Sequence, residues 1–482
     1  MTRSAQRWGL AALVSVSLAG CQLAPEHAPP VTASPQAWRE SSVTTNWPGA
    51  DWWRGFQSSE LDQLLKDAEA HNDDLLAAEA RVREADGELR IAGAALLPTV
   101  GLSSDAGELK TVNMIGKERH YGDASVSVGV SYELDFWGKN RAAKSAAKAT
   151  AEAAVYDREV VRLTVMTSVA NTYFQARALQ DQLQIAQQTA DLSKATLQAM
   201  QAEHNQGVID AQTLTVQEAQ VQSLEAATDP IAQQLTHMRN ALAILTGRSL
   251  ETLNIDGAPL DAIATPGLGA GVPSELLLHR PDVQRAEAAL ASANANITVA
   301  RAQFLPSFNL AGQYGVGGVM LASGASPFMS VYSLAAGMTQ PIFDGGRLHG
   351  QLDQTRARYS ELLADYSKTT RQAFVDVEDA LNAEQKTAAA EKADGVAVDR
   401  ARQAFAMSKA GYDAGAVNLL ALQAARAAVL PAQSALDQAR LTHLQSLVLL
   451  YQALGGGWSL NGDLSAPGSL TGKSSGSIPG RG

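Results

Sequence analysis

Residues 123–134 read Asp-Ala-Ser-Val-Ser-Val-Gly-Val-Ser-Tyr-Glu-Leu, in which apolar residues alternate with small or polar ones. A period of two predicts a β-strand with one apolar and one polar face. The alternation from Ala124 to Leu134 covers a length sufficient to cross a bilayer, which takes about 9–11 residues of tilted strand. A half-buried strand of a water-soluble sandwich has the same pattern, so the alternation alone leaves both interpretations open.

Weaker alternation occurs in three other segments, and we predict strands over 98–108, 123–135, 306–316 and 329–341. Four membrane strands cannot close a barrel. An open sheet edge in lipid leaves backbone groups unpaired, at several kcal/mol each. If these strands cross a membrane, the chain must therefore oligomerise to complete the wall. Two copies would supply eight strands and three copies twelve, and the spacing does not choose between them.

The strands belong to a duplicated unit. Matching residues recur about 208 positions apart: His71-Asn72-Asp73-Asp74 and His279-Arg280-Pro281-Asp282, Leu97-Pro98-Thr99 and Leu305-Pro306-Ser307, Gly207 and Gly415, Gly247 and Gly455. We therefore predict a first repeat over 51–250, a Gly- and Pro-rich connector over 251–273 and a second repeat over 274–458.

Long helices follow the strands in each repeat. Residues 139–205 contain neither proline nor glycine, which predicts a helix about 100 Å long at ~1.5 Å per residue. Gly207 and Gly415 would end the long helices, and the predicted hairpins run over about 139–246 and 345–454. Steps of three and four predict coiled-coil seams formed by Ala176, Leu179, Leu183, Ala186, Ala190, Ser193, Leu197 and Met200, and by Ala390, Ala393, Ala397, Ala404 and Met407.

The N-terminus has the features of an export signal. Arg3 and Arg7 precede a short apolar stretch from Trp8 to Leu18, and Leu18-Ala19-Gly20-Cys21 matches a bacterial lipoprotein cleavage site. We expect residues 1–20 to be removed and a lipid to be attached to Cys21, the only cysteine. Gln22, in place of aspartate, favours sorting to the outer membrane. We predict that residues 21–50 form an extended tether and that residues 459–482 form a flexible tail.

The net charge, the spacing of the histidines and the motifs argue against several other functions. The net charge of -11 argues against a nucleic-acid partner. The eight histidines show no metal-ligand spacing, and no phosphate loop, nucleophile elbow or zinc-protease motif is present. We therefore expect neither an enzyme nor a cofactor other than the lipid on Cys21. For His71 and His279, which lie just before predicted helices, we expect capping or packing roles.

Together these residues resemble the outer membrane factors, the TolC-like export channels, in their OprM/NodT-like lipoprotein branch. The resemblance extends from Cys21 to about Trp458 and rests on motifs in a fixed order: Trp52-Trp53-Arg54-Gly55-Phe56, Glu133-Leu134-Asp135-Phe136-Trp137-Gly138-Lys139, Leu277-Leu278-His279-Arg280-Pro281-Asp282-Val283, Gln340-Pro341-Ile342-Phe343-Asp344-Gly345-Gly346-Arg347 and Leu454-Gly455-Gly456-Gly457-Trp458.

The resemblance implies an α+β membrane protein that forms a homotrimer. Each protomer would supply four strands to a 12-stranded outer-membrane barrel, and a helical barrel would continue it through the periplasm. Such a protein is the passive exit duct of a tripartite efflux system for drugs or other small toxic compounds. Its partners would be a periplasmic adaptor (a membrane fusion protein), an inner-membrane pump and outer-membrane lipid. A non-channel periplasmic scaffold or adaptor lipoprotein is the alternative, and it would need the alternating segments to be water-soluble.

The same resemblance implies a gate at the periplasmic ends of the hairpins. Its candidate residues are Gly207, Asp210, Gly415, Asn418, Leu419, Leu420 and Gln423. The family commonly carries an acidic residue near Gln423, whereas this chain has Gln423-Ala424-Ala425-Arg426. That difference favours a constriction formed by Leu419 or Leu420 over a ring of charge.

Overall fold

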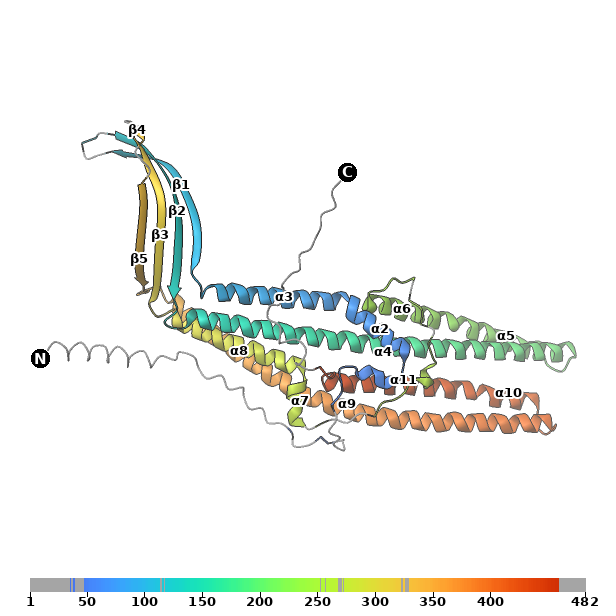
Figure 1. The fold of residues 1–482 in the computed structure, drawn as a ribbon. Helices are drawn as coiled ribbons and strands as arrows, with labels where there is room; N and C mark the ends of the chain where they lie inside the picture. Colours follow the sequence, from blue (N-terminus) through green and yellow to red (C-terminus); the bar gives the residue numbers. More distant parts are fainter. Residues whose placement is uncertain are drawn as a thin grey trace, which may run out of the picture. The chain divides into compact units, whose positions relative to one another are not determined.

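A computed structural model describes most of the chain between residues 35 and 458 (Figure 1). The described residues are 35, 38–39, 47–112, 115–116, 118–251, 253–255, 257–267, 271, 273–321, 324–325 and 329–458. Cys21, the predicted signal peptide and the predicted tail lie outside them. Two compact units are present. Unit 1 includes Leu76–Arg158 and Asp282–Arg371, and unit 2 includes the described parts of Ser34–Leu75, Glu159–Pro281 and Gln372–Gly482.

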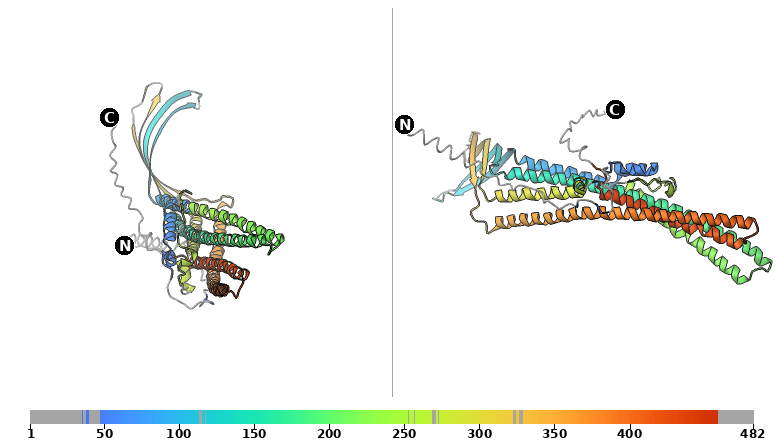
Figure 2. Two further views of the ribbon diagram at one scale, coloured as in Figure 1. Left: turned by 90° about the vertical axis from the view of Figure 1, so that its right-hand side faces the viewer. Right: turned by 90° about the horizontal axis from the view of Figure 1, so that it is seen from below.

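Unit 1 carries one curved antiparallel sheet (Figures 1 and 2). Its long strands lie in the order β1 (Thr99–Val112), β2 (Glu118–Leu134), β3 (Ser307–Leu321) and β5 (Met329–Thr339). The two-residue strand β4 (Gly324–Ala325) pairs with the end of β3. The first three strands extend beyond their predicted ends, because strand pairing continues through residues 109–112, 118–122 and 317–321, where apolar and polar residues no longer alternate.

The two repeats build their hairpins with the same register. Thr99 of β1 lies opposite Ser131 of β2, and Ser307 of β3 lies opposite Thr339 of β5. Each member of the second pair is 208 positions beyond its counterpart in the first, which is the spacing of the sequence duplication.

The long helices α4 (Lys139–Asn205) and α9 (Arg347–Asp413) have 67 residues each. Their bounds also differ by 208 positions. A carboxylate precedes each helix and accepts hydrogen bonds from its first turn. Asp135 accepts from Asn140 N at 3.0 Å, and Asp344 accepts from Leu348 N at 2.9 Å. This strand-to-helix turn accounts for the Asp-Gly-Gly sequence at 344–346 without any ligand.

Each return helix of the two hairpins is broken into two pieces. The first consists of α5 (Ala211–Ala226) and α6 (Thr228–Thr246), and the second of α10 (Leu419–Ala427) and α11 (Val429–Ala453). Pro230 and Pro431 explain the breaks. A proline lacks the N–H that would bond four residues back, and its ring clashes with that carbonyl, which here belongs to the last residue of α5 or α10.

Only one of the two predicted seams is covered within the chain. Every residue of the seam in α4 is buried or half-buried. Ser193 accepts a hydrogen bond from Gln217 Nε2 on α5 at 2.9 Å. The corresponding stripe in α9 is not covered in the single chain: its residues Ala390, Ala393, Ala397, Ala404 and Met407 are exposed. Periodicity identified an apolar stripe in α9 but not the face that packs.

Unit 2 contains the principal core, in which aromatic residues from distant parts of the chain meet. The short helix η1 (Trp52–Phe56) lies in it, and Trp52 stacks on Tyr451 of α11 at 4.7 Å between ring centroids. Phe56 contacts Phe174 of α4 at 5.1 Å. The helices α2 (Ser59–His71), η2 (Leu260–Ala262) and α7 (Pro273–His279) also belong to unit 2, and α3 (Asp73–Ala94) and α8 (Pro281–Ala302) lead into unit 1.

Parts of the predicted tether pack against unit 2. Trp38 is 5% exposed, and its indole donates to Gly271 O at 2.7 Å. Trp47 stacks on His279. These two tryptophans of the predicted tether are therefore held by contacts within unit 2. No helix in the described part of the chain is both long and apolar enough to span a bilayer.

Candidate functional site

One face of the sheet is apolar from edge to edge. The register places Val128 of β2 opposite Leu102 of β1 and Tyr314 of β3. Tyr332 and Leu334 on β5 are 83% and 85% exposed. Exposed apolar patches of this extent mark a surface that is covered by lipid or by protein. The face consists of Val100, Leu102, Val126, Val128, Val130, Leu310, Tyr314, Val316, Tyr332, Leu334 and Met338.

The opposite face is largely polar, and its side chains bond to one another. Ser103 Oγ and Ser127 Oγ are 2.9 Å apart, and Gln313 Nε2 donates to Ser127 Oγ at 2.7 Å. Met329 and Val331 at one end of β5 are apolar exceptions. Hydroxyl and amide groups of this kind suit a wall that faces water, as in the lumen of a membrane barrel.

Both edges of the sheet are open. Among the described residues, β1 pairs only with β2, and β5 pairs only with β3. Each outer edge therefore presents a row of backbone N–H and C=O groups. In a bilayer these groups must be paired, because water cannot reach them. The isolated sheet is thus an incomplete membrane wall.

The two hairpin ends of unit 2 share one turn geometry. Gly207 and Gly415 both have a φ of 74°, the left-handed conformation that glycine adopts without a steric penalty. Asp210 Oδ1 accepts from Thr213 N at 2.7 Å and caps α5. Asn418 Oδ1 accepts from Ala421 N at 2.8 Å and caps α10. The structure thus places these four predicted gate residues at equivalent positions in the two turns.

The turns differ in charge. Hydrogen bonds from the Thr213 side chain and backbone lower the pKa of Asp210, and the charge of His204 adds to this effect. Asp210 is therefore ionised at neutral pH, whereas Asn418 is neutral. His204 also bonds through Nδ1 to Ile209 O at 3.0 Å. Of the two duplicated turns, only the first carries a negative charge at its cap.

The remaining predicted gate residues lie on α10. Leu419 and Leu420 begin this helix, and their side chains lie outside the described part of the structure. Gln423 is half-buried, and its Oε1 has no hydrogen-bond partner among the described residues. Arg402 of α9 and Arg426 of α10 line a nearby cavity of about 570 Å³, together with Phe405. Sequence reasoning did not single out this cavity, because its lining comes from three separate segments.

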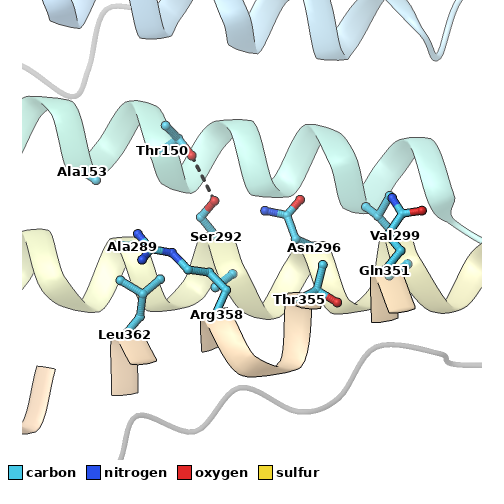
Figure 3. A pocket seen from close by; sticks show the side chains of 12 residues that line it. Thr150, Ala153, Ala289, Ser292, Asn296, Val299, Gln351, Thr355, Arg358 and Leu362 are labelled. Carbon is cyan, nitrogen blue, oxygen red and sulfur yellow. Dashed lines mark hydrogen bonds between the residues drawn. The ribbon is translucent and has the colours of Figure 1, made fainter. Parts of the chain in front are cut away.

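A second cavity, of about 370 Å³, lies in unit 1 between α4, α8 and α9 (Figure 3). Thr150 Oγ1 and Ser292 Oγ lie 3.0 Å apart at its wall. Its other polar lining groups come from Asn296, Gln351, Thr355 and Arg358. The lining contains no carboxylate and no imidazole, so it offers no general base. Nowhere in the described residues do three or more His, Cys, Asp or Glu side chains gather as a metal site.

Comparison with known proteins agrees with this architecture. Residues 64–248 and 272–456 both match the outer membrane efflux protein family, again 208 positions apart. The chain is 36% identical to the pyoverdine export outer membrane protein OpmQ of Pseudomonas putida, over 92% of this chain and 96% of that protein. It is 28% identical to the cation efflux system protein CusC of Escherichia coli O6:H1, over 92% and 97%.

A solved structure shows the same fold. The open state of the Neisseria gonorrhoeae MtrE outer membrane channel superposes with a TM-score of 0.79 at 28% identity, covering 90% of this chain and 98% of that one. The predicted fold class, an α+β membrane protein with four long strands per chain and an internal repeat, is confirmed. The chain belongs to the outer membrane efflux protein family, and it is the outer-membrane channel of a tripartite efflux system.

Proposed function

We propose that three copies of this chain form a 12-stranded barrel that serves as a passive exit duct. The observation that carries the proposal is the sheet itself, which has one apolar face, one polar face and two open edges. Four strands are too few to enclose a channel, and closure also removes the unpaired edges. The apolar face would meet lipid and the polar face would line the lumen.

The partners in this proposal are a periplasmic adaptor and an inner-membrane pump. The helical hairpins would extend into the periplasm and meet the adaptor. The cargo is proposed to be drugs or other small toxic compounds. OpmQ is named for pyoverdine and CusC for cations, yet each aligns with nearly the whole chain. Such different cargoes on one scaffold support a wall that passes molecules without choosing among them and without catalysing a reaction.

The gate is proposed to lie at the hairpin turns. The two glycine turns and their caps hold the ends of four helices, so a small change in helix packing there would alter the width of a central opening. Asp210 and Gln423 are polar, and Leu419 and Leu420 supply apolar bulk. Adaptor binding would open the gate if the adaptor contacts the open arrangement better than the closed one.

The lipid anchor is proposed on Cys21. The cleavage site, the single cysteine and Gln22 support acylation and outer-membrane sorting. Mass spectrometry of the mature N-terminus tests this, and an unmodified Cys21 would contradict it. In a Cys21→Ser variant we expect acylation to fail while the barrel still inserts, because closing the wall contributes more to membrane affinity than one lipid group.

Four experiments test the channel. Detergent-extracted protein should run as a trimer, and it should conduct ions in planar bilayers. Adding a side chain at a hairpin end, as in Gly207→Ala or Gly415→Ala, should change the conductance or its open fraction. Deleting the gene should sensitise cells to toxic compounds. A monomer without conductance would contradict the proposed trimeric duct.

A further inference from the structure

We infer that β5 of one copy pairs with β1 of the next in one specific register, which the internal duplication determines. In this register Thr339 lies opposite Ser103 of the next copy, Gly337 opposite Asp105 and Ala335 opposite Gly107. The inference rests on the proposed assembly of several copies into one barrel. It adds the residue register at the contact between β5 of one copy and β1 of the next, which we call the barrel seam. This register decides which side chains meet there.

The first step is the equivalence of the two hairpins. The β1–β2 and β3–β5 ladders have the same register after a shift of 208 positions, from Thr99 and Ser131 to Ser307 and Thr339. The long helices that follow β2 and β5 shift by the same amount without a gap. Each copy therefore contributes two nearly equivalent hairpins, β1–β2 and β3–β5, to the wall.

The second step is the junction between these two hairpins. Within one chain, β2 of the first hairpin pairs with β3 of the second hairpin, and Ser127 lies opposite Gly315. At the seam, β5 takes the place of β2 and β1 of the next copy takes the place of β3. Shifting Ser127 forward by 208 leads to Ala335, and shifting Gly315 back by 208 leads to Gly107. The same operation on Ser131 and Ala311 gives Thr339 and Ser103.

Strand direction is consistent with this seam. Each neighbouring pair in the order β1-β2-β3-β5 is antiparallel. Hence β5 runs opposite to β1. A rotation about a barrel axis preserves the direction of every strand, so β5 of one copy meets β1 of the next in antiparallel orientation.

The side-chain faces are also consistent. The register puts Ala336 opposite Ala106 and Met338 opposite Ser104, all on the lipid side of their strands. Gly337, Thr339, Ser103 and Asp105 remain on the polar side. A shift of one residue would exchange these faces. Only shifts by an even number of residues therefore compete with the register proposed.

Two glycines distinguish among those competitors. At the junction within the chain, Gly315 lies opposite Ser127, and a Cβ on this glycine would come within 2.7 Å of Ser127 Cβ. The seam has the same combination, with Gly107 opposite Ala335. Gly129 lies opposite Gln313, and its counterpart Gly337 meets Asp105. Gly107 and Gly337 are the positions equivalent to Gly315 and Gly129 after the shift of 208. We take their recurrence as support for one geometry at the β2–β3 contact and at the contact between copies.

Disulfide formation between copies tests the register. We expect Gly337→Cys combined with Asp105→Cys to give covalent dimers and trimers after oxidation of outer-membrane fractions, as seen on non-reducing gels. Thr339→Cys combined with Ser103→Cys is the second designed pair, and neither position in it is a glycine. Cysteines directly opposite each other across a ladder are within reach of a disulfide.

The matched controls use the same four substitutions in exchanged combinations. Thr339→Cys with Asp105→Cys, and Gly337→Cys with Ser103→Cys, lie two residues out of register and should cross-link about tenfold less. Variants with only one of the introduced cysteines show whether that cysteine forms a disulfide with the native Cys21. Stronger linking of the exchanged pairs would overturn the register and leave the trimer intact. A protein that runs as a monomer, with no pair linked, would overturn both the register and the proposed assembly.

Discussion

Gly455 approaches the backbone carbonyl of His279 so closely that a Cβ added to this glycine would lie 2.0 Å from the carbonyl oxygen. The first repeat holds the counterpart, in which a Cβ on Gly247 would lie 2.5 Å from His71 O. Next to these contacts, Arg280 Nη1 donates to Ala453 O at 3.2 Å, and Asn72 Nδ2 donates to Leu245 O at 2.9 Å. The duplicated motif at 71 and 279 thus packs against the end of each return helix.

We predict that Gly455→Ala destabilises unit 2 by more than about 2 kcal/mol, because it adds both a clash and a strained positive φ. Thermal unfolding of the detergent-solubilised protein measures the effect. Gly267→Ala is the control, since nothing lies within 4 Å of a Cβ added there. Equal melting temperatures for the two variants would contradict the packing described.

At the hairpin end, Gly415→Ala should destabilise the turn by about 1–2 kcal/mol, because alanine is strained at this φ. Gly350→Ala in α9 is the matched control, since the site has open space and lies inside a helix, where alanine is favoured by about 1 kcal/mol. Hydrogen exchange of the amides at 411–421 reports local opening of the turn. Faster exchange in both variants, or in neither, would refute this explanation.

On the sheet, adjacent residues of β5 should respond in opposite ways to a charge. Leu334→Lys places an ammonium group on the lipid face, at a cost of about 2–4 kcal/mol near the bilayer midplane. Ser333→Lys places it on the polar face and should be tolerated. Recovery of folded protein from the outer membrane provides the measurement. If Ser333→Lys proved the more damaging, the assignment of the two faces would be reversed.

In unit 2, Glu391 of α9 accepts hydrogen bonds from Arg440 and His443 of α11. Burial alone raises the pKa of Glu391, but these hydrogen bonds and the nearby positive charges outweigh it and lower the pKa below 4.5. The carboxylate therefore contributes stability above pH 4.5, and this contribution is lost as the pH falls through the lower pKa of the folded state.

Glu391→Gln should consequently lower stability at pH 7 by about 3 kcal/mol and should lessen the loss of stability on acidification below pH 4.5. Thermal unfolding at several pH values measures both effects. Glu361→Gln is the control, because Glu361 pairs with Arg358 at an exposed position, and such pairs contribute about 0–1 kcal/mol. Identical pH profiles for Glu391→Gln and the wild type would exclude the role given to this carboxylate.

Several features could be predicted from local sequence. The absence of proline and glycine over 139–205 defines α4, and the alternation in 123–134 identifies the two faces of β2. The glycine turns at 207 and 415 also follow from residue type, since few other residues adopt a positive φ. Other features could not be predicted in this way. The stripe of α9 that is exposed has the same period as the one in α4 that packs, and Trp52 meets Tyr451 across almost 400 positions of sequence.

The duplication, the period of each segment and the polarity of each strand face can be derived from the residue order alone, because a period or a repeat is a property of positions along the chain. The three-dimensional fold was needed to show which helix stripe is covered, where Trp38 and Trp47 pack, and that β1 and β5 lie at open edges of the sheet. These features depend on contacts between residues that are far apart in the sequence. One local pattern of apolar and polar residues is compatible with many different sets of such contacts.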